Sequence, residues 1–301
     1  MDTFLNREKP GAVIRVSDED SLDYLQSQLS VNLSVLEKGG CRFALRLNTR
    51  GRVLAGIYVL RTAEEEFLLV SRTSKASFLL ELLAENVVAD EVEFSDETKQ
   101  WNIHAVWGGD TEKVLEDHDL TVPESGKFVS GQSGYAWLDS RLPDKTVSLL
   151  IRENLDHENQ LVEADLQLVE ADELESLRIE AGLVSVPQEI GPNDLPQEGG
   201  LVESSVDFDK GCYLGQEVMA RLRVTGKARR QSVPVKWSGE DLIATPVGLY
   251  SGNRKLGELR SLVMGKDRGQ GIALVNDSAI TVLKSEGLIP KGSTSGKVTS
   301  L

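Results

Sequence analysis

The spacing of apolar residues changes once along the chain, at about residue 225 of 301. Before that point, alternating runs typical of strands are interleaved with segments whose apolar residues recur every three or four positions, as in helices. After it, alternating runs predominate and the helical spacing is lost. Interleaved strands and helices favour an α+β fold over an all-α or all-β one. We therefore predict an α+β protein that ends in a small all-β domain, a β-barrel, at residues 226–301.

The individual elements follow from the same spacing. Strands are expected at residues 13–16, 42–47, 53–60, 66–70, 233–237, 256–263, 271–275 and 279–283. Helices are expected after a cap at Ser17 and Asp20, after Ser74, at residues 110–117, and from about Asp172 to a C-cap at Gly182. The helix after Ser74 should bury Phe78, Leu79, Leu82 and Leu83.

Charge and composition exclude several classes of protein. The chain carries 33 Lys and Arg against 48 Asp and Glu, a formal net charge of −15, and such a field repels nucleic acids and anionic membranes. No apolar stretch approaches the roughly 20 residues of a membrane helix, and the N-terminal residues lack the apolar segment of a secretory signal. Cys41 and Cys212 belong to no CxxC pair. We therefore expect a cytoplasmic protein with free thiols and neither nucleic-acid nor membrane partners.

Several motifs that carry chemistry are missing from the sequence. It contains no GxGxxG after a strand, no GxxxxGK[ST], no HExxH and no GxSxG. The three histidines, His104, His118 and His157, lack the spacing of metal ligands. We expect no metal site and no hydrolase triad, and we expect the histidines at surface or structural positions.

The most unusual string is Lys-Gly-Cys-Tyr-Leu-Gly-Gln-Glu at residues 210–217. Its glycines allow a tight turn around Cys212, and Lys210 is close enough in sequence to favour the thiolate. The alternative is a small structural cysteine buried in the turn. A basic stretch follows, containing Arg221, Arg223, Lys227, Arg229 and Arg230. It is a candidate for holding a carboxylate or phosphate, and the alternative is a strand with its basic side chains outward.

Together with Leu-Arg-Ile-Glu-Ala-Gly at 177–182 and Leu-Pro-Gln-Glu at 195–198, this string resembles the YgfZ-type folate-binding proteins. These are relatives of the glycine-cleavage T-protein, the tetrahydrofolate-dependent aminomethyltransferase. Residues 20–29 and the turn at 48–54 match the family in order, and Gly-Ile-Ala at 271–273 falls where its barrel lies. The signature positions are Lys210, Gly211, Cys212, Tyr213, Gly215, Gln216 and Glu217.

The resemblance implies a three-domain ring of two antiparallel α+β domains and a C-terminal β-barrel around a central folate cavity. The domains are expected at 1–50 with 135–225, at 51–134, and at 226–301. The implied cofactor is tetrahydrofolate or a derivative. A carboxylate suits the donor edge of a pterin, and cations suit its glutamyl tail. By motif position we expect Glu180 at the pterin, Glu198 as a second ligand, and Arg221 near the acidic part.

The resemblance also bears on whether the chain is an enzyme. Aminomethyltransferases of the family continue from the turn after Asn48 into two aspartates, one of which serves the chemistry at the folate nitrogens. This chain has Ala55-Gly56 there, and neither residue stabilises a developing cation or relays a proton. The T-proteins also lack the cysteine string. Both differences favour the YgfZ-type branch and an accessory role over catalysis.

That branch is linked to the assembly or repair of iron–sulfur proteins, including radical enzymes that modify tRNA, and its signature cysteine matters for this role. We hypothesise a tetrahydrofolate-binding accessory factor whose partners are iron–sulfur client or assembly proteins. Cys212 would act by thiol exchange or as a shared cluster ligand, since one thiol cannot supply the usual four. The alternatives are a folate-dependent aminomethyl or one-carbon transferase and a non-catalytic interaction scaffold.

Overall fold

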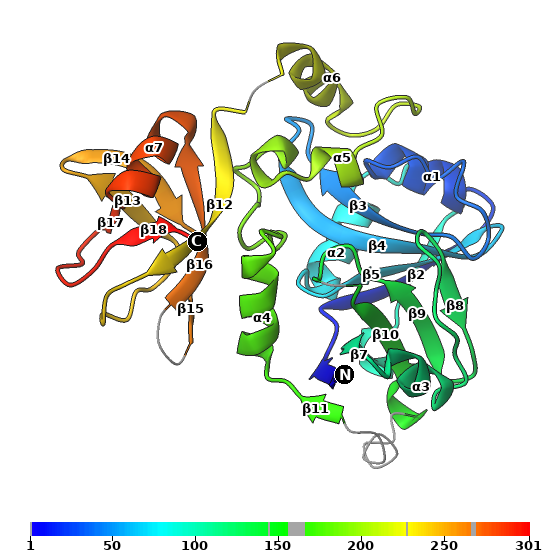
Figure 1. Ribbon diagram of the computed structural model, residues 1–301. Helices are drawn as coiled ribbons and strands as arrows, with labels where there is room; N and C mark the ends of the chain where they lie inside the picture. The colour runs from blue at the N-terminus through cyan, green and yellow to red at the C-terminus, as the bar shows by residue number, and fades with distance from the viewer. Residues whose placement is uncertain (1, 144, 156–165, 227, 266–268) are drawn as a thin grey trace.

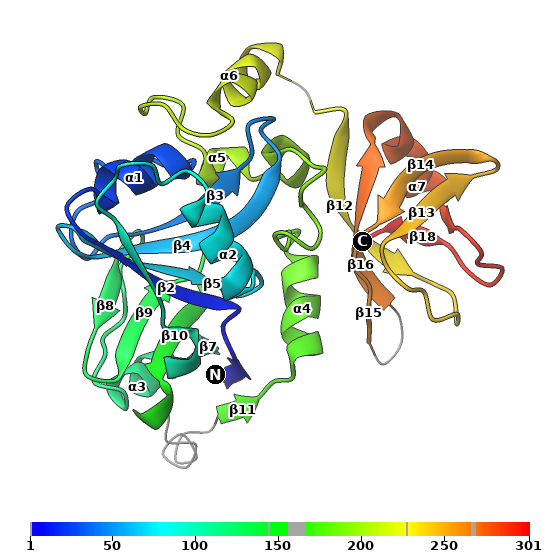
Figure 2. The same ribbon diagram turned by 180° about the vertical axis from the view of Figure 1, so that it is seen from behind.

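The computed structural model describes the chain except for residues 1, 144, 156–165, 227 and 266–268. The described residues form three β-sheets (Figure 1). Two of them lie together on one side, and the third forms a separate C-terminal unit (Figures 1 and 2). The long helix α4 (Ala171–Glu180) lies between the two sides.

The first sheet has five strands in the order β3-β4-β5-β2-β6, and every neighbouring pair is antiparallel. Its strands are β2 (Ala12–Ser17), β3 (Cys41–Leu47), β4 (Val53–Ala63), β5 (Glu66–Ser71) and β6 (Glu93–Asp96). Two helices, α1 (Ser21–Gln28) and α2 (Ala76–Ala84), bury their apolar faces in the core that this sheet forms.

The second sheet has six strands in the order β11-β1-β7-β10-β9-β8. These are β1 (Thr3–Glu8), β7 (Trp101–Gly108), β8 (Phe128–Ser130), β9 (Gly134–Leu138), β10 (Val147–Arg152) and β11 (Leu166–Leu168), with helix α3 (Thr111–Glu116) packed beside them. All pairs are antiparallel except the short parallel pair of β1 and β11. One buried cluster, which includes Tyr58 and Trp137 with their rings 5.4 Å apart, joins this sheet to the first.

The C-terminal sheet follows the order β17-β13-β14-β16-β12-β18, and β15 (Val263–Met264) pairs with β16. Its other strands are β12 (Arg230–Trp237), β13 (Val247–Ser251), β14 (Arg254–Leu259), β16 (Gly269–Asn276), β17 (Ile289–Pro290) and β18 (Val298–Ser300). The two ends meet at an antiparallel bridge between Leu288 and Val298, which exchange two backbone hydrogen bonds of 2.8 Å. The sheet therefore closes almost completely around its core, and the predicted β-barrel is confirmed.

Short helices connect α4 to the barrel. They are a 3₁₀ turn at Pro196–Gly199, α5 (Val202–Ser205) and α6 (Gln216–Thr225). The predicted end of α4 is confirmed, because Gly182 follows the helix with φ +69° and its amide donates to the Ile179 carbonyl. The predicted α+β class with antiparallel sheets is likewise confirmed.

Three local predictions are wrong. Residues 279–283, predicted as a strand, lie in a 3₁₀ turn and helix α7 (Ile280–Ser285). Ala279 and Leu283 are buried while Thr281 between them is exposed, which fits the helical period and not the period of two. Phe78 in α2, predicted to be buried, is 40% exposed, whereas Leu79, Leu82 and Leu83 are buried as predicted. Asp20 precedes α1 without capping it through its side chain, since that carboxylate accepts the Glu91 amide instead.

The sheets divide the N-terminal half differently from the expected domains. The boundary expected between residues 50 and 51 falls in the turn that joins β3 to β4, and β3 pairs with β4 along the whole of β3. Residues 12–96 supply the whole first sheet, and residues 3–8 join residues 101–168 in the second. The second sheet is thus the discontinuous one, because its strand β1 precedes the first sheet in the sequence. All strands of the barrel come from residues 230–300.

Candidate functional site

Lys210 anchors the signature string to the end of α1. Its Nζ donates to three backbone carbonyl oxygens, those of Gln26, Leu29 and Val31, at 2.7, 2.6 and 2.7 Å. The ammonium also lies 5.0 Å from the ring centroid of Tyr213. Burial lowers the pKa of Lys210 to about 8, against an opposing effect of Asp207. Because carbonyls engage all three of its donors, we assign Lys210 a structural role rather than the expected activation of the thiol.

Gly215 packs the other end of the string against the turn at residues 48–51. It is the N-cap residue of α6 with φ +84°, and a Cβ there would lie 2.8 Å from the Asn48 carbonyl oxygen. On the opposing turn, Gly51 has φ +69°, and a Cβ there would lie 2.9 Å from Cβ of Val218. Two segments that the sequence offers as separate matches to one family are therefore packed together, and each needs a glycine.

Between these anchors, Cys212 is exposed. Tyr213 beside it is buried, and the amide of Leu214 donates to the Ser27 carbonyl at 3.2 Å. The remaining signature residues are exposed Gly211, half-buried Gln216 and exposed Glu217. The string is thus a fixed loop that presents one thiol to solvent. Cys41 differs, because it is buried in the core and burial raises the pKa of its thiol well above the ordinary value.

A cavity of about 210 Å³ lies where the two N-terminal sheets meet α4. Its walls come from β3, β4, residues 70–73, residues 139–142, α4 and residues 184–186. Phe43, Tyr58 and several aliphatic side chains supply apolar surface, and Arg72, Arg141 and Arg178 supply positive charge. We call this space the central cavity. A concave, mostly apolar site with a few convergent polar groups is the usual form of a small-molecule site.

Carboxylates balance two of these arginines. Arg72 lies 3.0 Å from Glu8 and 3.6 Å from Asp139. Arg178 makes two hydrogen bonds of 2.8 and 2.9 Å to the fully buried Glu189 and also pairs with Glu175. Burial alone would lower the pKa of Arg178, but the hydrogen bonds to Glu189 and Glu175 outweigh it and raise that pKa.

Gly56 lies in the wall of the central cavity, at one of the two positions where the resemblance places aspartates in aminomethyltransferases. A Cβ on Gly56 would lie 2.6 Å from Cζ of Phe43 and 3.1 Å from Cβ of Val186. Ala55 beside it is completely buried. Neighbouring side chains therefore fill the space that a carboxylate would need at residue 56.

Glu180, expected at the pterin, does not line the central cavity. It is exposed, and its Oε1 accepts a 2.8 Å hydrogen bond from the Gln270 side chain on the barrel. Glu175 and Arg178 of the same helix do line the cavity. Five residues turn a helix by about 140° beyond a full circle, so Glu175 and Glu180 face different neighbours.

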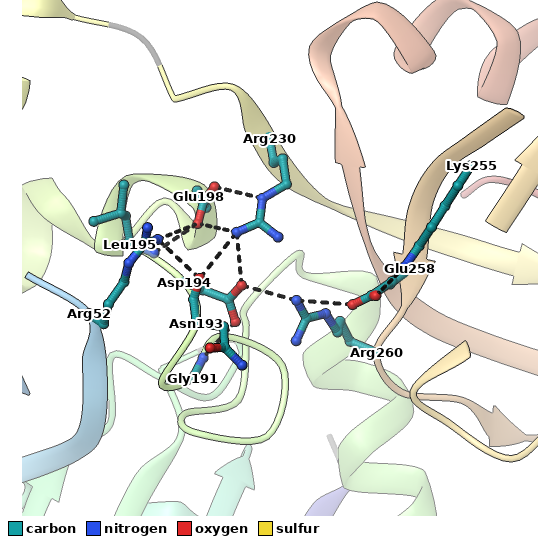
Figure 3. Close-up of polar contacts among 10 residues, drawn as sticks. All are labelled: Arg52, Gly191, Asn193, Asp194, Leu195, Glu198, Arg230, Lys255, Glu258 and Arg260. Atoms are coloured by element: carbon teal, nitrogen blue, oxygen red, sulfur yellow. Dashed lines mark hydrogen bonds and ion pairs between the residues drawn. The ribbon is translucent and has the colours of Figure 1, made fainter. Parts of the chain in front are cut away.

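Glu198, the expected second ligand, belongs to an ion-pair network between the barrel and residues 191–198 (Figure 3). It is 4% exposed and accepts two hydrogen bonds from Arg230, of 2.8 and 2.9 Å. Asp194 binds Arg230 at 3.1 Å and Arg260 at 3.0 Å. The Glu198 carboxylate is thereby used in joining two parts of the fold. It also borders a second, polar cavity of about 310 Å³.

The basic stretch after the signature begins in helix α6, so its interpretation as a strand is wrong at Arg221 and Arg223. Both side chains are exposed, and neither borders the two cavities. Lys227 lies outside the described residues, as does His157. His104 and His118 are buried. In the described part of the chain, no three His, Cys, Asp or Glu side chains gather in a way that would hold a metal ion.

The sequence did not single out Arg72, Asp139 or Arg141. Asp139 and Arg141 follow directly after the buried end of β9, and charged residues just beyond a buried strand are a usable signal for a site. Arg178 lies inside the Leu-Arg-Ile-Glu-Ala-Gly string at 177–182, two residues before Glu180.

Residues 12–133 match the family model described as the GCVT N-terminal domain. The chain is 25% identical to "tRNA-modifying protein YgfZ" of Sodalis glossinidius over 73% of its length and 67% of that protein. It is 26% identical to "Iron-sulfur cluster assembly factor IBA57 homolog, mitochondrial" of Cryptococcus neoformans, over 75% of this chain and 64% of the relative. The expected resemblance is confirmed. The chain thus spans about two thirds of the length of these relatives.

A solved structure also matches the fold. The aminomethyltransferase T of the Bartonella henselae glycine cleavage system covers 100% of this chain with a TM-score of 0.82 at 20% identity, over 86% of its own length. The T-protein-like arrangement of two α+β sheet units and a barrel is therefore confirmed as a fold. In addition, no helix within the described ranges is long and apolar enough to cross a membrane.

Proposed function

We propose that this protein is a cytoplasmic, tetrahydrofolate-binding accessory factor for the assembly or repair of iron–sulfur proteins, including radical enzymes that modify tRNA. Relatives named for tRNA modification and for iron–sulfur cluster assembly support the proposal. Its partners would be iron–sulfur client or assembly proteins.

The observation that carries the proposal is the exposed thiol of Cys212 in a loop fixed on both sides. Lys210 holds one side through three carbonyls, and Gly215 holds the other by close backbone packing. A thiol presented in this way is accessible to a partner protein. Because a cluster usually takes four cysteine ligands, Cys212 would act as one shared ligand or by thiol exchange.

The central cavity supports the folate part of the proposal. Its volume of about 210 Å³ lies below the roughly 300–1,000 Å³ of sites for whole drug-sized ligands, so it suits the pterin ring with the tail outside. Phe43 and Tyr58 offer aromatic surface, and Glu175, whose side chain is 43% exposed, offers a carboxylate. A carboxylate is the natural partner for adjacent pterin donors. Glu180, Glu198 and Arg221 were expected here by motif position, and Glu175 replaces them as our candidate.

Two other functions compete with this one. A folate-dependent aminomethyl or one-carbon transferase needs a carboxylate free to act at the folate nitrogens. Packing around Gly56 opposes one at that position, and buried Asp139 already accepts hydrogen bonds from Tyr58 and Ser148. A non-catalytic scaffold that binds no folate is the second alternative. It would keep the Cys212 loop and leave the central cavity without a role.

Calorimetric titration with tetrahydrofolate tests the proposal, using the wild type, Glu175→Gln and Glu180→Gln. We expect saturable binding by the wild type, a loss of about tenfold in Glu175→Gln, and little change in Glu180→Gln. A selective loss in Glu180→Gln would return the pterin to the position first expected from the motif. Absence of wild-type binding would favour the scaffold, and turnover of an aminomethyl donor would favour the transferase.

A further inference from the structure

Arg141 is shared by the two cavities. It follows β9, and it lines both the central cavity and the polar cavity beside Glu198. Its guanidinium carbon lies 5.4 Å from the ring centroid of Phe43, and one terminal nitrogen donates to the Val184 carbonyl at 2.8 Å. A ligand group that passed from one cavity to the other would pass this guanidinium.

Arg141 differs from the other two arginines of the central cavity in its partners. Arg72 and Arg178 each contact carboxylates, as described above. Among the residues that the structure describes, Arg141 forms no ion pair. Its Nε, like that of Arg72, is buried without a hydrogen-bond acceptor, so the missing carboxylate is what distinguishes Arg141. Arg141 is half-buried, and removing a cation from water is costly unless an anion compensates it.

The charged side chains around Arg141 already pair with other groups. Asp139 accepts hydrogen bonds from Tyr58 and Ser148 and from the backbone amide of Arg141, and it lies 3.6 Å from Arg72. Arg178 and Glu189 pair with each other. Burial lowers the pKa of Arg141, and the attraction of Asp139 only partly opposes this effect. The guanidinium therefore lacks a counter-charge of its own.

The second cavity offers further polar groups at the same place. Gln197, Gln231 and Ser232 line it with side-chain N–H and O–H groups that can donate to a carboxylate, and Glu198, which also lines it, pairs with Arg230. The central cavity, in contrast, offers mainly apolar and aromatic walls. The two spaces thus suit the two ends of one amphipathic molecule.

We infer that Arg141 binds the carboxylate of a ligand whose ring lies in the central cavity and whose acidic end reaches the polar cavity. An arginine fork matches a carboxylate in a bidentate geometry. The identity of the ring rests on the proposed function, so the acidic end would be the glutamyl tail of a folate. The anion site itself does not depend on that identity, because any ligand that carries an aromatic ring and a carboxylate offers the same two groups.

Three probes separate the ring from the acid. Tetrahydrofolate carries both, 6-methyltetrahydropterin carries the ring alone, and p-aminobenzoylglutamate carries the acidic tail alone. We expect Arg141→Gln to weaken binding of tetrahydrofolate and of p-aminobenzoylglutamate by about tenfold or more and to leave 6-methyltetrahydropterin unchanged. Arg141→Lys, which keeps the charge without the fork, should give a smaller loss for the same two probes.

Arg152→Gln is the matched control. Arg152 also lies over an aromatic ring, 4.7 Å from the centroid of Trp101, but it lines neither cavity. The two glutamine variants lose the same charge, but only Arg141 lines the cavities. We therefore expect a change in binding for Arg141→Gln and none for Arg152→Gln. Circular dichroism establishes that each variant is folded, and Arg141→Lys carries the test if Arg141→Gln does not fold.

The outcomes distinguish this inference from the proposed function. Equal weakening of 6-methyltetrahydropterin, or unchanged binding of all three probes in the Arg141 variants, would overturn the carboxylate site even if the wild type binds folate. Binding of p-aminobenzoylglutamate that requires Arg141, without any binding of tetrahydrofolate or pterin, would support the anion site while overturning the folate proposal.

Discussion

Replacing Gly215 with alanine should damage the anchor of the Cys212 loop far more than the same change at a glycine in open space. Gly215 has φ +84°, and Gly226, at the other end of α6, has φ +74°. A left-handed conformation costs an L-residue about 1–2 kcal/mol, and the restricted unfolded chain returns about 0.4–1 kcal/mol. Gly226→Ala should therefore lower the free energy of unfolding by roughly 0–1.6 kcal/mol.

Gly215→Ala adds an overlap that Gly226→Ala lacks. Its Cβ would lie 2.8 Å from the Asn48 carbonyl oxygen and 3.0 Å from Cα of Gly51, whereas nothing lies within 4 Å of a Cβ at Gly226. Both contacted atoms are backbone, so the turn must shift, and overpacking of this kind costs about 1–3 kcal/mol. The total for Gly215→Ala is then about 3 kcal/mol.

Urea unfolding followed by tryptophan fluorescence measures the difference between the two variants, because the same slope converts each midpoint shift into a free energy. We expect Gly215→Ala to lose about 2 kcal/mol more than Gly226→Ala. Equal losses would show that positive φ alone accounts for the glycine of the signature, and the packing of the loop on the turn at 48–51 would have no energetic weight.

Three other predictions concern the thiols, the buried lysine and the ion-pair network. A thiol reagent such as dithionitrobenzoate should modify one cysteine of the native protein, exposed Cys212, and both only after unfolding, since Cys41 is buried; rapid modification of both in the native state would contradict the placement of Cys41. Because burial lowers the folded-state pKa of Lys210 from 10.5 to about 8, the unfolded chain binds more protons between those pH values. The stability of the wild type relative to Lys210→Met should thus rise from pH 8 to 10.5, by about 2 kcal/mol after allowance for solvent, and a flat or falling difference in urea titrations would refute the shift. Glu198→Gln should cost about 2–3 kcal/mol of stability, because it leaves Arg230 with one fewer carboxylate, while calorimetry should find folate affinity unchanged; an affinity loss with intact stability would restore Glu198 as a ligand.

Local spacing predicted most of the fold. Leu79, Leu82 and Leu83 bury one face of α2, and Gly182 ends α4 as its sequence position indicates. The failures occur where short segments carry little periodic information. The run from Ala279 to Leu283 is too short to distinguish a strand from a helix, and tertiary packing decides for the helix.

The site was less predictable because it depends on contacts between distant segments. The sequence identified the signature string, but it did not show that Lys210 would bond to carbonyls of residues 26–31 rather than assist the thiol. It also gives no direction for the side chains of α4, so motif position favours Glu180, whereas Glu175 faces the cavity. Arg141 borders both cavities only because its loop meets β3 and residues 182–184 in the folded chain.

The most direct test of the proposed function is whether Cys212→Ser supports iron–sulfur enzyme activity in cells that lack this protein. Cys41→Ala is the control, because it removes the other thiol from a buried position. At matched levels of folded protein, we predict that the wild type and Cys41→Ala restore the activity of a radical tRNA-modifying enzyme and that Cys212→Ser does not. Full restoration by Cys212→Ser would contradict the proposed role of the exposed thiol.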